Sequence, residues 1–389
     1  SRRPLRKCWQ ATLTTFIIRR FIFLAFVLFG VSVLIFGILM TFSPERRAMA
    51  YVKSPQQVKD LPLIVEQHGL NDPFYVQYGR WLKEVSTGNW GYSIVAAKPV
   101  WEAFWYYFPI TLELNLFTIP IIILLGIWLG TISGIYRDTW VDHLTRIFAI
   151  IGWSLPTFLF ALIILMFFYG YLDLFPPGYI DDQYNLWIHE NPDQFRRYTY
   201  LYTVDGLLNG RFDIAWDAFK RLVMPVFTQV VVIVAILLRV MRSSMIEEIS
   251  KDYVMTARAK GARLKDIYFK HARKNALIPV ITVAGWLAAY SMEGSIAVEY
   301  IFNRQGIGWW LAHSAMQLDM PVLMCICLFM GIVFVVTNLT LDILQTAGPA
   351  RDVILVGEGQ SELEDDLARA AATQGRFVTP ENLPENGLF

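Results

Sequence analysis

The residue types that perform catalysis are present in this sequence, but they do not occur at the spacings that enzymes use. The sequence contains no Gly-x4-Gly-Lys-Ser/Thr phosphate loop, no His-Glu-x-x-His metal pair and no Gly-x-Ser-x-Gly nucleophile turn. Its five histidines are isolated, and its three cysteines form neither a Cys-x-x-Cys pair nor an even-numbered disulfide framework. We therefore expect a protein that is not an enzyme and that binds no metal ion or other cofactor itself.

Three polar side chains are notable because they lie near the ends of strongly apolar stretches. Glu293 lies between Met292 and Gly294, and Glu113 and Asn115 lie early in another stretch. Placing an ionisable group in lipid costs at least about 2.5 kcal/mol, so such groups are candidates for a substrate pathway. The alternative is that Glu293 extends to the lipid–water interface and that Glu113 and Asn115 also lie there. The sequence leaves both possibilities open.

A polar segment at 239–275 has the pattern of two short amphipathic helices joined by a glycine. Apolar residues in its first half are spaced by 3, 4 and 4 positions, and the second half has a similar face. Gly261 lies between the halves, as expected for a tight turn, and Pro279 is expected to open the next apolar stretch. The two faces consist of Ile246, Ile249, Tyr253 and Ala257, and of Leu264, Ile267, Tyr268 and Ala272.

These two apolar faces need a partner, because the segment lies between apolar stretches and not within one. A helix lying in a groove of another protein is one solution. Contact with lipid headgroups is the other, and the ten Lys and Arg residues at 239–274 favour it. Periodicity alone does not distinguish the two.

The elements that position these residues are predicted to be membrane-spanning helices. Apolar residues form 55% of the chain and charged residues only 17%, against about 25% in soluble domains. A helix rises about 1.5 Å per residue, so some 20 residues cross a hydrocarbon core of about 30 Å. The fold class is therefore all-α, a polytopic membrane protein with six spans. The predicted spans are 21–42, 110–135, 147–172, 222–238, 277–297 and 321–343.

The distribution of basic residues predicts which side of the membrane each loop faces. The segment 1–20 contains six Lys and Arg residues and 239–274 contains ten, whereas 298–320 contains one. Basic loops stay in the cytoplasm, so both termini and the loop 239–275 are expected there, and the loops 43–108 and 173–221 outside. The loop 173–221 is long enough to form a small external subdomain. The net charge of +1 gives no basic field for nucleic acid, so membrane lipid is the expected surrounding.

Several motifs together resemble one transporter family. Thr256-Ala257-Arg258 followed by Gly261, and then the stretch from Lys270 to Pro279, are similar to the EAA loop of ABC importer permeases. The sequence is closest to the B-type subunit of the dipeptide/oligopeptide/nickel group. Further similarities lie at 17–20, 69–78, 111–114, 306–308 and 319–322.

The resemblance implies that the chain is one permease half of an ATP-driven importer in a prokaryotic cytoplasmic (inner) membrane. The loop would be the coupling helix that docks on one of two cytoplasmic ATPase subunits, which bind ATP and Mg. A second homologous permease and an extracytoplasmic substrate-binding protein would complete the complex. The expected coupling residues are Tyr253, Thr256, Ala257, Arg258, Gly261, His271, Asn275 and Pro279.

The substrate that the resemblance implies is a peptide, and oligosaccharides or nickel are alternatives within the same architecture. A secondary transporter and a membrane scaffold are alternatives from other classes. A secondary transporter would need ionisable residues near the bilayer midplane, and often internal repeats. A scaffold would need no pathway, and a transport assay would separate it.

The chain departs from the pattern of this family in three places. The loop 173–221 is longer than the compact loop usual there, and the C-terminal Asp-Pro-Arg signature is replaced by Gly348-Pro349-Ala350-Arg351. The tail 348–389 contains eight acidic and three basic residues, which favours a solvated cytoplasmic extension. Ser361 and Glu364 have the spacing of a capping box that would start a helix over 361–372.

Overall fold

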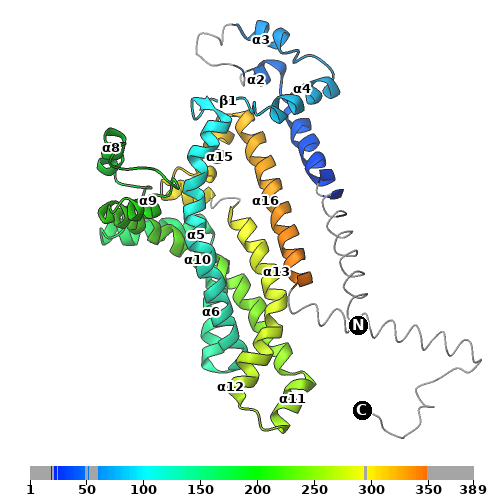
Figure 1. Ribbon diagram of the computed structural model, residues 1–389, viewed down its shortest axis with the longest axis vertical. Coiled ribbons are helices and arrows are strands. Elements are labelled where there is room, and N and C mark those ends of the chain that lie inside the picture. Colours follow the sequence, from blue (N-terminus) through cyan, green and yellow to red (C-terminus); the bar gives the residue numbers. More distant parts are fainter. Residues whose placement is uncertain are drawn as a thin grey trace, which may run out of the picture. The chain divides into compact units, whose positions relative to one another are not determined.

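The computed structural model describes residues 19, 22–23, 25–48, 51, 60–292 and 296–347. Most of these residues are helical (Figure 1), which confirms the predicted all-α class. The described strands, β1 (Tyr92–Ser93) and β2 (Lys98–Pro99), form one short antiparallel pair. Most of the basic segment 1–20, the candidate residue Glu293 and the acidic tail 348–389 with its predicted helix lie outside the described residues.

The chain divides into two compact units, Ser1–Leu339 and Thr340–Phe389. Of the second unit the structure describes the end of helix α16 (Met320–Ala347). The other helices and the sites between them belong to the first unit. Its short helices are α2 (Pro44–Ala48), α3 (Leu61–Gln67), α4 (Phe74–Ser86), α8 (Asp182–Glu190), α9 (Tyr202–Leu208), α11 (Asp252–Ala259), α12 (Leu264–Asp266), α14 (Ile296–Ile301) and α15 (Ile307–Met316).

Four helical stretches in the described residues are long and apolar enough to cross a membrane. They are α5 (Val100–Ile135), α10 (Phe212–Ile249), Leu264–Met292, which ends in α13 (Arg273–Met292), and Met320–Leu341 within α16. The predicted span 21–42 contains the shorter apolar helix Ala25–Leu39.

Helix α10 is much longer than the sequence predicts, because polar residues beyond both ends of the predicted span 222–238 have partners inside the protein. At one end Arg221 donates to Asp181 and Asp217, at 2.8 and 3.0 Å. At the other end Arg242 makes two hydrogen bonds to Asp142, at 2.6 and 2.7 Å. A hydropathy pattern ends the predicted span at these charged residues. In the structure their ion pairs satisfy the charges, and the helix extends past them to a total length of 38 residues.

The predicted span 147–172 is not one straight helix. It consists of α6 (Trp140–Ser154) and α7 (Thr157–Leu165), extended by the wider π-helical turns of η3 (Met166–Tyr171), and the two parts are bent by 99°. Pro156 explains the bend, because it lacks a backbone N–H and forces the preceding residue out of the helical region. Leu155 accordingly has extended backbone angles, φ −81° and ψ 125°.

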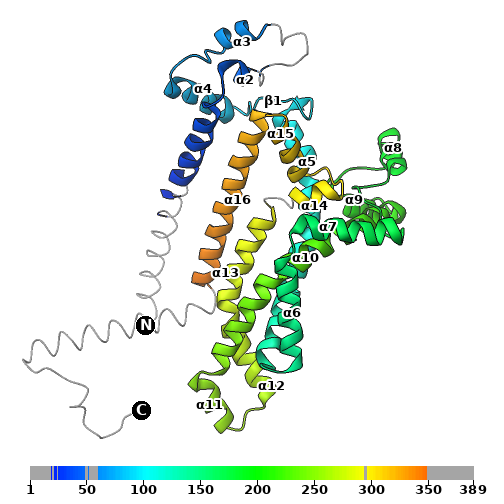
Figure 2. The same cartoon turned by 180° about the vertical axis from the view of Figure 1, so that it is seen from behind.

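Two smaller groups of helices flank the long ones. Helices α14 and α15 pack against each other, and they contact α7 and α5 respectively (Figure 2). The segment from Ile180 to Ala218, which includes α8 and α9, has its own cluster of buried apolar side chains. A small folded subdomain needs a buried apolar core of its own, and this cluster provides one for the segment 173–221.

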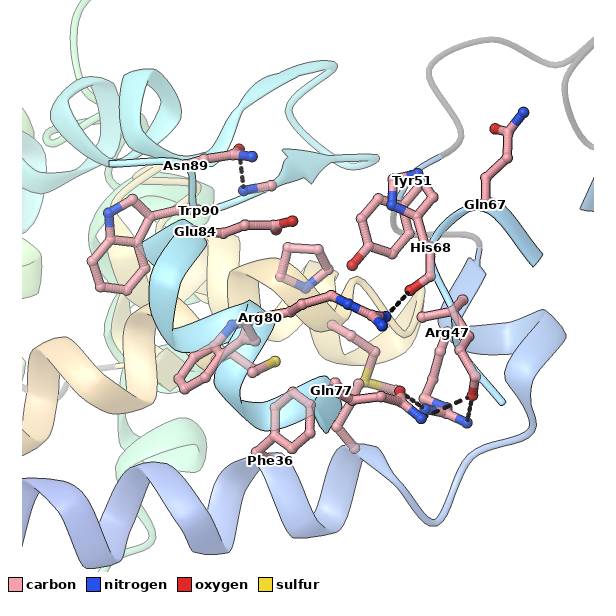
Figure 3. Close-up of a pocket in the computed structure, with 17 residues that line it drawn as sticks. Phe36, Arg47, Tyr51, Gln67, His68, Gln77, Arg80, Glu84, Asn89 and Trp90 are labelled. Atoms are coloured by element: carbon pink, nitrogen blue, oxygen red, sulfur yellow. Dashed lines mark hydrogen bonds between the residues drawn. The ribbon is translucent and has the colours of Figure 1, made fainter. Parts of the chain in front are cut away.

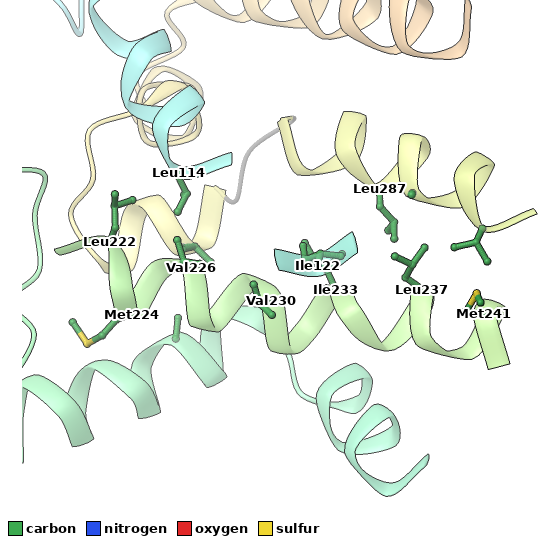
Figure 4. Close-up of a cluster of buried hydrophobic side chains, with 14 of the residues drawn as sticks. Leu114, Ile122, Leu222, Met224, Val226, Val230, Ile233, Leu237, Met241 and Leu287 are labelled. Carbon is green, nitrogen blue, oxygen red and sulfur yellow. The ribbon is translucent and has the colours of Figure 1, made fainter. Parts of the chain in front are cut away.

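The main core lies where α10 packs between α5 and α13. Ile122 of α5 and Leu287 of α13 lie against α10 in the same buried cluster (Figure 4). Three glycines spaced four residues apart on α5 face α10, and a Cβ atom on Gly126, Gly130 or Gly134 would approach Leu237, Met241 and Met245 respectively. Small residues at such spacing let two helix backbones approach closely, as in membrane helix pairs.

We expect Gly130→Ala to destabilise the protein by about 1–3 kcal/mol, because it overpacks this interface. The new Cβ would lie 2.6 Å from Met241 Cβ and 2.8 Å from the Leu238 carbonyl oxygen, and backbone cannot move aside cheaply. Thermal unfolding of the purified protein in detergent measures the loss. The control is Gly37→Ala in the helix Ala25–Leu39, where no atom lies within 4 Å of the added methyl group. Equal unfolding midpoints for the two variants would contradict the close-packing interpretation.

Candidate functional site

The segment predicted as two helices with a glycine turn has that form in the structure. Helix α11 ends at Ala259, and Gly261 follows with a φ of +78°, a backbone conformation that glycine adopts without strain. Helix α12 and the π-helical segment η4 (Ile267–Ala272) then lead directly into α13. One boundary differs from the prediction. Ile246 and Ile249 belong to the end of α10, and α11 begins only after Lys251, whose backbone is extended.

Part of the apolar face is buried inside this chain, so the expectation that all of it needs an external partner is wrong. Ile267 and Ala272 of the predicted face are both 0% exposed, and Val254, which the predicted face did not include, is 1% exposed. Their burial is possible because η4 packs against both α10 and α11. The segment is therefore a folded part of the protein and does not depend on lipid to cover these side chains.

A second set of side chains remains exposed around the glycine turn. Met255 and Leu264 are 61% and 54% exposed, and both lie in the polar segment 239–275. Basic side chains surround them. We call this set the α11–α12 surface, and it consists of Met255, Thr256, Arg258, Lys260, Gly261, Arg263, Leu264 and Lys265.

Polar contacts fix α11 to its neighbours. The Tyr253 hydroxyl donates to Glu248 of α10 at 2.8 Å, and it also hydrogen-bonds to the Asn275 side chain of α13. Burial, together with this bond to Glu248, raises the pKa of Tyr253 to about 12, so the hydroxyl stays protonated and keeps its donor. Arg258 donates to the Tyr268 hydroxyl at 2.9 Å. These hydrogen bonds connect α11 to α10, η4 and α13.

The remaining predicted coupling residues lie at the edge of this arrangement. Ala257 is half-buried and His271 is exposed on η4. Pro279 does not open a helix, because α13 begins at Arg273 and Pro279 lies inside it. A proline in this position removes one backbone hydrogen bond, and the helix continues through it.

At the other end of α5, Glu113 lies in a buried ion pair. Its Oε2 is 3.2 Å from Arg304 Nη2, and both side chains are 0% exposed. Its Oε1 accepts hydrogen bonds from the backbone N–H and the hydroxyl of Thr203, at 2.9 and 2.6 Å. The pair joins α5 to α9 and to the turn before α15. Here Glu113 stabilises the arrangement of three elements and does not face an open cavity.

Asn115 also has its hydrogen bonds inside the protein. Its side-chain nitrogen donates to the Thr111 carbonyl oxygen at 2.9 Å, and its oxygen accepts from the Ser291 hydroxyl at 2.5 Å. Asn115 is 1% exposed, and its hydrogen bond to Ser291 connects α5 with α13.

Glu299 is a buried polar residue that the sequence motifs did not indicate, although Gly306 and Gly308, which lie close to it in the structure, were a signal. Glu299 is fully buried and accepts hydrogen bonds from the Thr111 hydroxyl at 2.7 Å and the Trp309 backbone N–H at 3.1 Å. A Cβ atom on Gly306 would lie 2.5 Å from Glu299 Oε2. The Gly306-x-Gly308 motif thus lets the N-terminus of α15 approach a carboxylate, an arrangement that helix N-termini favour.

Two cavities lie in or beside the segments predicted as external loops. One, of about 270 Å³, lies between α4, the helix Ala25–Leu39 and the start of α16, with Arg47 and the stacked rings of Tyr51 and His68 on its wall (Figure 3). The other, of about 860 Å³, lies between the first turns of α5 and the segment around α8 and α9. Its lining combines aromatic rings with side chains of both charges, including Trp101, Trp105, Tyr200, Lys98, Glu102, Asp182 and Arg197.

Comparison with known protein families gives two matches. Residues 122–350 match the family described as binding-protein-dependent transport system inner membrane component. Residues 13–115 match the family that describes the N-terminal part of such membrane components.

Similar proteins cover most of the chain. A dipeptide transport system permease of Alkalihalophilus pseudofirmus is 35% identical over 329 residues, which are 84% of this chain and 95% of that protein. A probable D,D-dipeptide transport system permease of Escherichia coli K12 is 37% identical over 72% of this chain and 81% of its own. An oligopeptide transport system permease of Bacillus subtilis 168 is 32% identical over 85% of this chain and 97% of its own.

Proposed function

The chain belongs to the family of binding-protein-dependent transport system inner membrane components, and we propose that it forms half of the translocation path of an ATP-driven peptide importer. Relatives at 32–37% identity are named as dipeptide and oligopeptide permeases, which supports peptides over oligosaccharides or nickel as the substrate. The family also favours this function over a secondary transporter or a scaffold.

The observation that carries this proposal is the exposed α11–α12 surface on a chain without a phosphate loop. Energy from ATP must enter such a chain through a partner. A folded helix pair with exposed Met255 and Leu264, ringed by basic residues, suits a groove on a cytoplasmic ATPase. Two such ATPases with bound ATP and Mg, and a second homologous permease, would complete the membrane complex.

The orientation follows from the same proposal. The α11–α12 surface and both termini lie in the cytoplasm of a prokaryotic cell, which agrees with the ten basic residues at 239–274. A binding protein then docks outside, on the segments 43–108 and 173–221. The cavity of about 860 Å³ between α5 and the α8–α9 segment is of a size that accommodates small-molecule ligands.

Co-purification of partners with surface variants tests this proposal. We expect Met255→Glu combined with Leu264→Glu to abolish co-purification of the ATPases from mild detergent, because the two changes place carboxylates on the proposed contact surface, where both side chains are more than half exposed. Leu207→Glu combined with Leu208→Glu is the matched control, since these α9 residues are 56% and 60% exposed in the proposed external segment. Retention of the ATPases by the first variant, or their equal loss from both, would contradict docking at α11–α12.

The substrate requires a separate measurement. The purified complex, reconstituted with its binding protein in lipid vesicles, is expected to accumulate labelled tripeptides only when ATP is present on the cytoplasmic side. An oligosaccharide or nickel should not compete. Uptake that follows an ion gradient without ATP would instead indicate a secondary transporter.

A further inference from the structure

The bend between α6 and α7 lies beside a cavity of about 460 Å³. The cavity lining comes from the two sides of the bend, from α10, and from the end of α13 and the start of α14. Non-helical backbone is tolerated at membrane depth where it is buried in protein or lines a cavity, and Leu155 and Pro156 line this one. Its other principal lining residues are Trp153, Gln229, Trp286, Tyr290 and Ser291.

Gln229 is the polar side chain of α10 on this cavity, and part of it has no partner. It is 2% exposed, and its Oε1 accepts no hydrogen bond within the part of the chain that the structure describes. It lies near the middle of the predicted span 222–238, where the other residues except Thr228 are apolar. A buried, unpaired carboxamide destabilises a protein relative to an apolar side chain of the same shape. Stability therefore does not account for glutamine at this position.

The opposite wall of the cavity is aromatic. The rings of Trp286 and Tyr290 stack with their centroids 5.6 Å apart, and both side chains are about half exposed. Ser291, next to them, is held by its hydrogen bond to Asn115. Flat aromatic surfaces accept apolar groups of many shapes, whereas a carboxamide has a defined donor and acceptor.

We propose that this cavity contacts the peptide during translocation and that Gln229 Oε1 accepts a hydrogen bond from a backbone N–H of the peptide. This inference rests on the proposed function as a peptide importer. Peptides that differ in every side chain share the backbone amide, so a carboxamide is suited to recognise the class. Rotation of the terminal carboxamide, whose torsion is broad, brings Oε1 to the cavity surface. The aromatic wall accommodates the variable side chains.

A cycle of protein and substrate changes tests the contact. Transport into vesicles is measured for the native complex and for Gln229→Leu, each with a tripeptide and with its backbone N-methylated analogue, which lacks the N–H. We expect Gln229→Leu to lower the maximal rate for the tripeptide about tenfold, the equivalent of one hydrogen bond of about 1.4 kcal/mol. The same substitution should change the rate for the analogue less than twofold. Because each comparison uses one peptide, any preference of the binding protein cancels.

Thr228→Val is the matched control. Thr228 is the adjacent α10 residue, is 0% exposed, and its hydroxyl also has no hydrogen-bond partner in the described structure, but it does not line the cavity. We expect less than a twofold change with either peptide, and unfolding midpoints at or above the native value for both variants.

The possible outcomes separate the two proposals. If the native complex imports the tripeptide and Gln229→Leu slows both peptides equally, or neither, the amide contact is wrong and the importer stands. Equal losses in Thr228→Val would also overturn the contact, because the effect would then not depend on the cavity. If the native complex imports no peptide with ATP present, the proposed function fails and this inference fails with it.

Discussion

Replacing Gly261 by valine should reduce peptide transport at least tenfold and remove the stimulation of ATP hydrolysis by loaded binding protein. The φ of +78° at Gly261 lies in the left-handed region, which strains any residue with a Cβ atom by about 1–2 kcal/mol, and a β-branched residue more. The site is exposed and no atom lies within 4 Å of an added Cβ, so the backbone alone is affected. Relief of the strain moves α11 relative to α12, which displaces the α11–α12 surface.

The chain offers a matched control for this prediction. Gly88, after α4, has a φ of +86°, is exposed, and also has no atom within 4 Å of an added Cβ. Gly88→Val therefore introduces the same kind of strain far from the proposed ATPase contact, and we expect transport within twofold of native. Both variants are compared in vesicles at equal amounts of folded protein. Substrate-stimulated ATP hydrolysis that persists in Gly261→Val would rule out the coupling role of this turn.

The buried pair Glu113–Arg304 should dominate the stability of the α5–α9–α15 contact. We expect Arg304→Met to destabilise the protein by about 3–5 kcal/mol, because it leaves the fully buried Glu113 carboxylate without a counter-ion. It also removes the guanidinium that lies 4.9 Å from the ring centre of Tyr179. The apparent unfolding midpoint in detergent and the yield of folded protein from membranes measure the loss.

A second variant distinguishes the charge from the packing. Glu113→Gln combined with Arg304→Met should recover more than half of the lost stability, because the side chain at position 113 then has no charge that requires Arg304 as a counter-ion. Arg304 Nε and Nη1 have no hydrogen-bond partner among the described residues, so little is lost when methionine replaces them. Asp213→Asn, which breaks the partly exposed pair with Arg211, is expected to change stability by less than about 1 kcal/mol. If the double variant is no more stable than Arg304→Met, the charge explanation is wrong.

The sequence predicted the local features of the segment 239–275 well. A glycine between two amphipathic patterns is a short-range feature of the sequence. The structure has the turn at Gly261 and the helices on either side of it, as this pattern predicts. The burial of Ile267 and Ala272 could not be predicted, because it depends on α10, which only the folded chain places beside them.

Long-range pairs and helix ends were harder to predict. Glu113 and Arg304 are separated by 191 positions, so the sequence showed a polar residue near a span and gave no indication of its partner. Without its partner, Glu113 has the features of a pathway residue. Hydropathy does not reveal the bend at Pro156, because its average over many residues stays high through a single proline. The role of Glu293 stays a prediction.

Helix α10 is one continuous element of 38 residues, about 57 Å long at 1.5 Å per residue. Near its start Arg221 is held by Asp181, and near its end Glu248 accepts from Tyr253 of α11. A binding protein docked outside and an ATPase docked inside would therefore both act on helix α10. If docking outside favours one state of the ATPase through the tilt of α10, thermodynamic reciprocity requires that this ATPase state strengthens outside docking by the same factor.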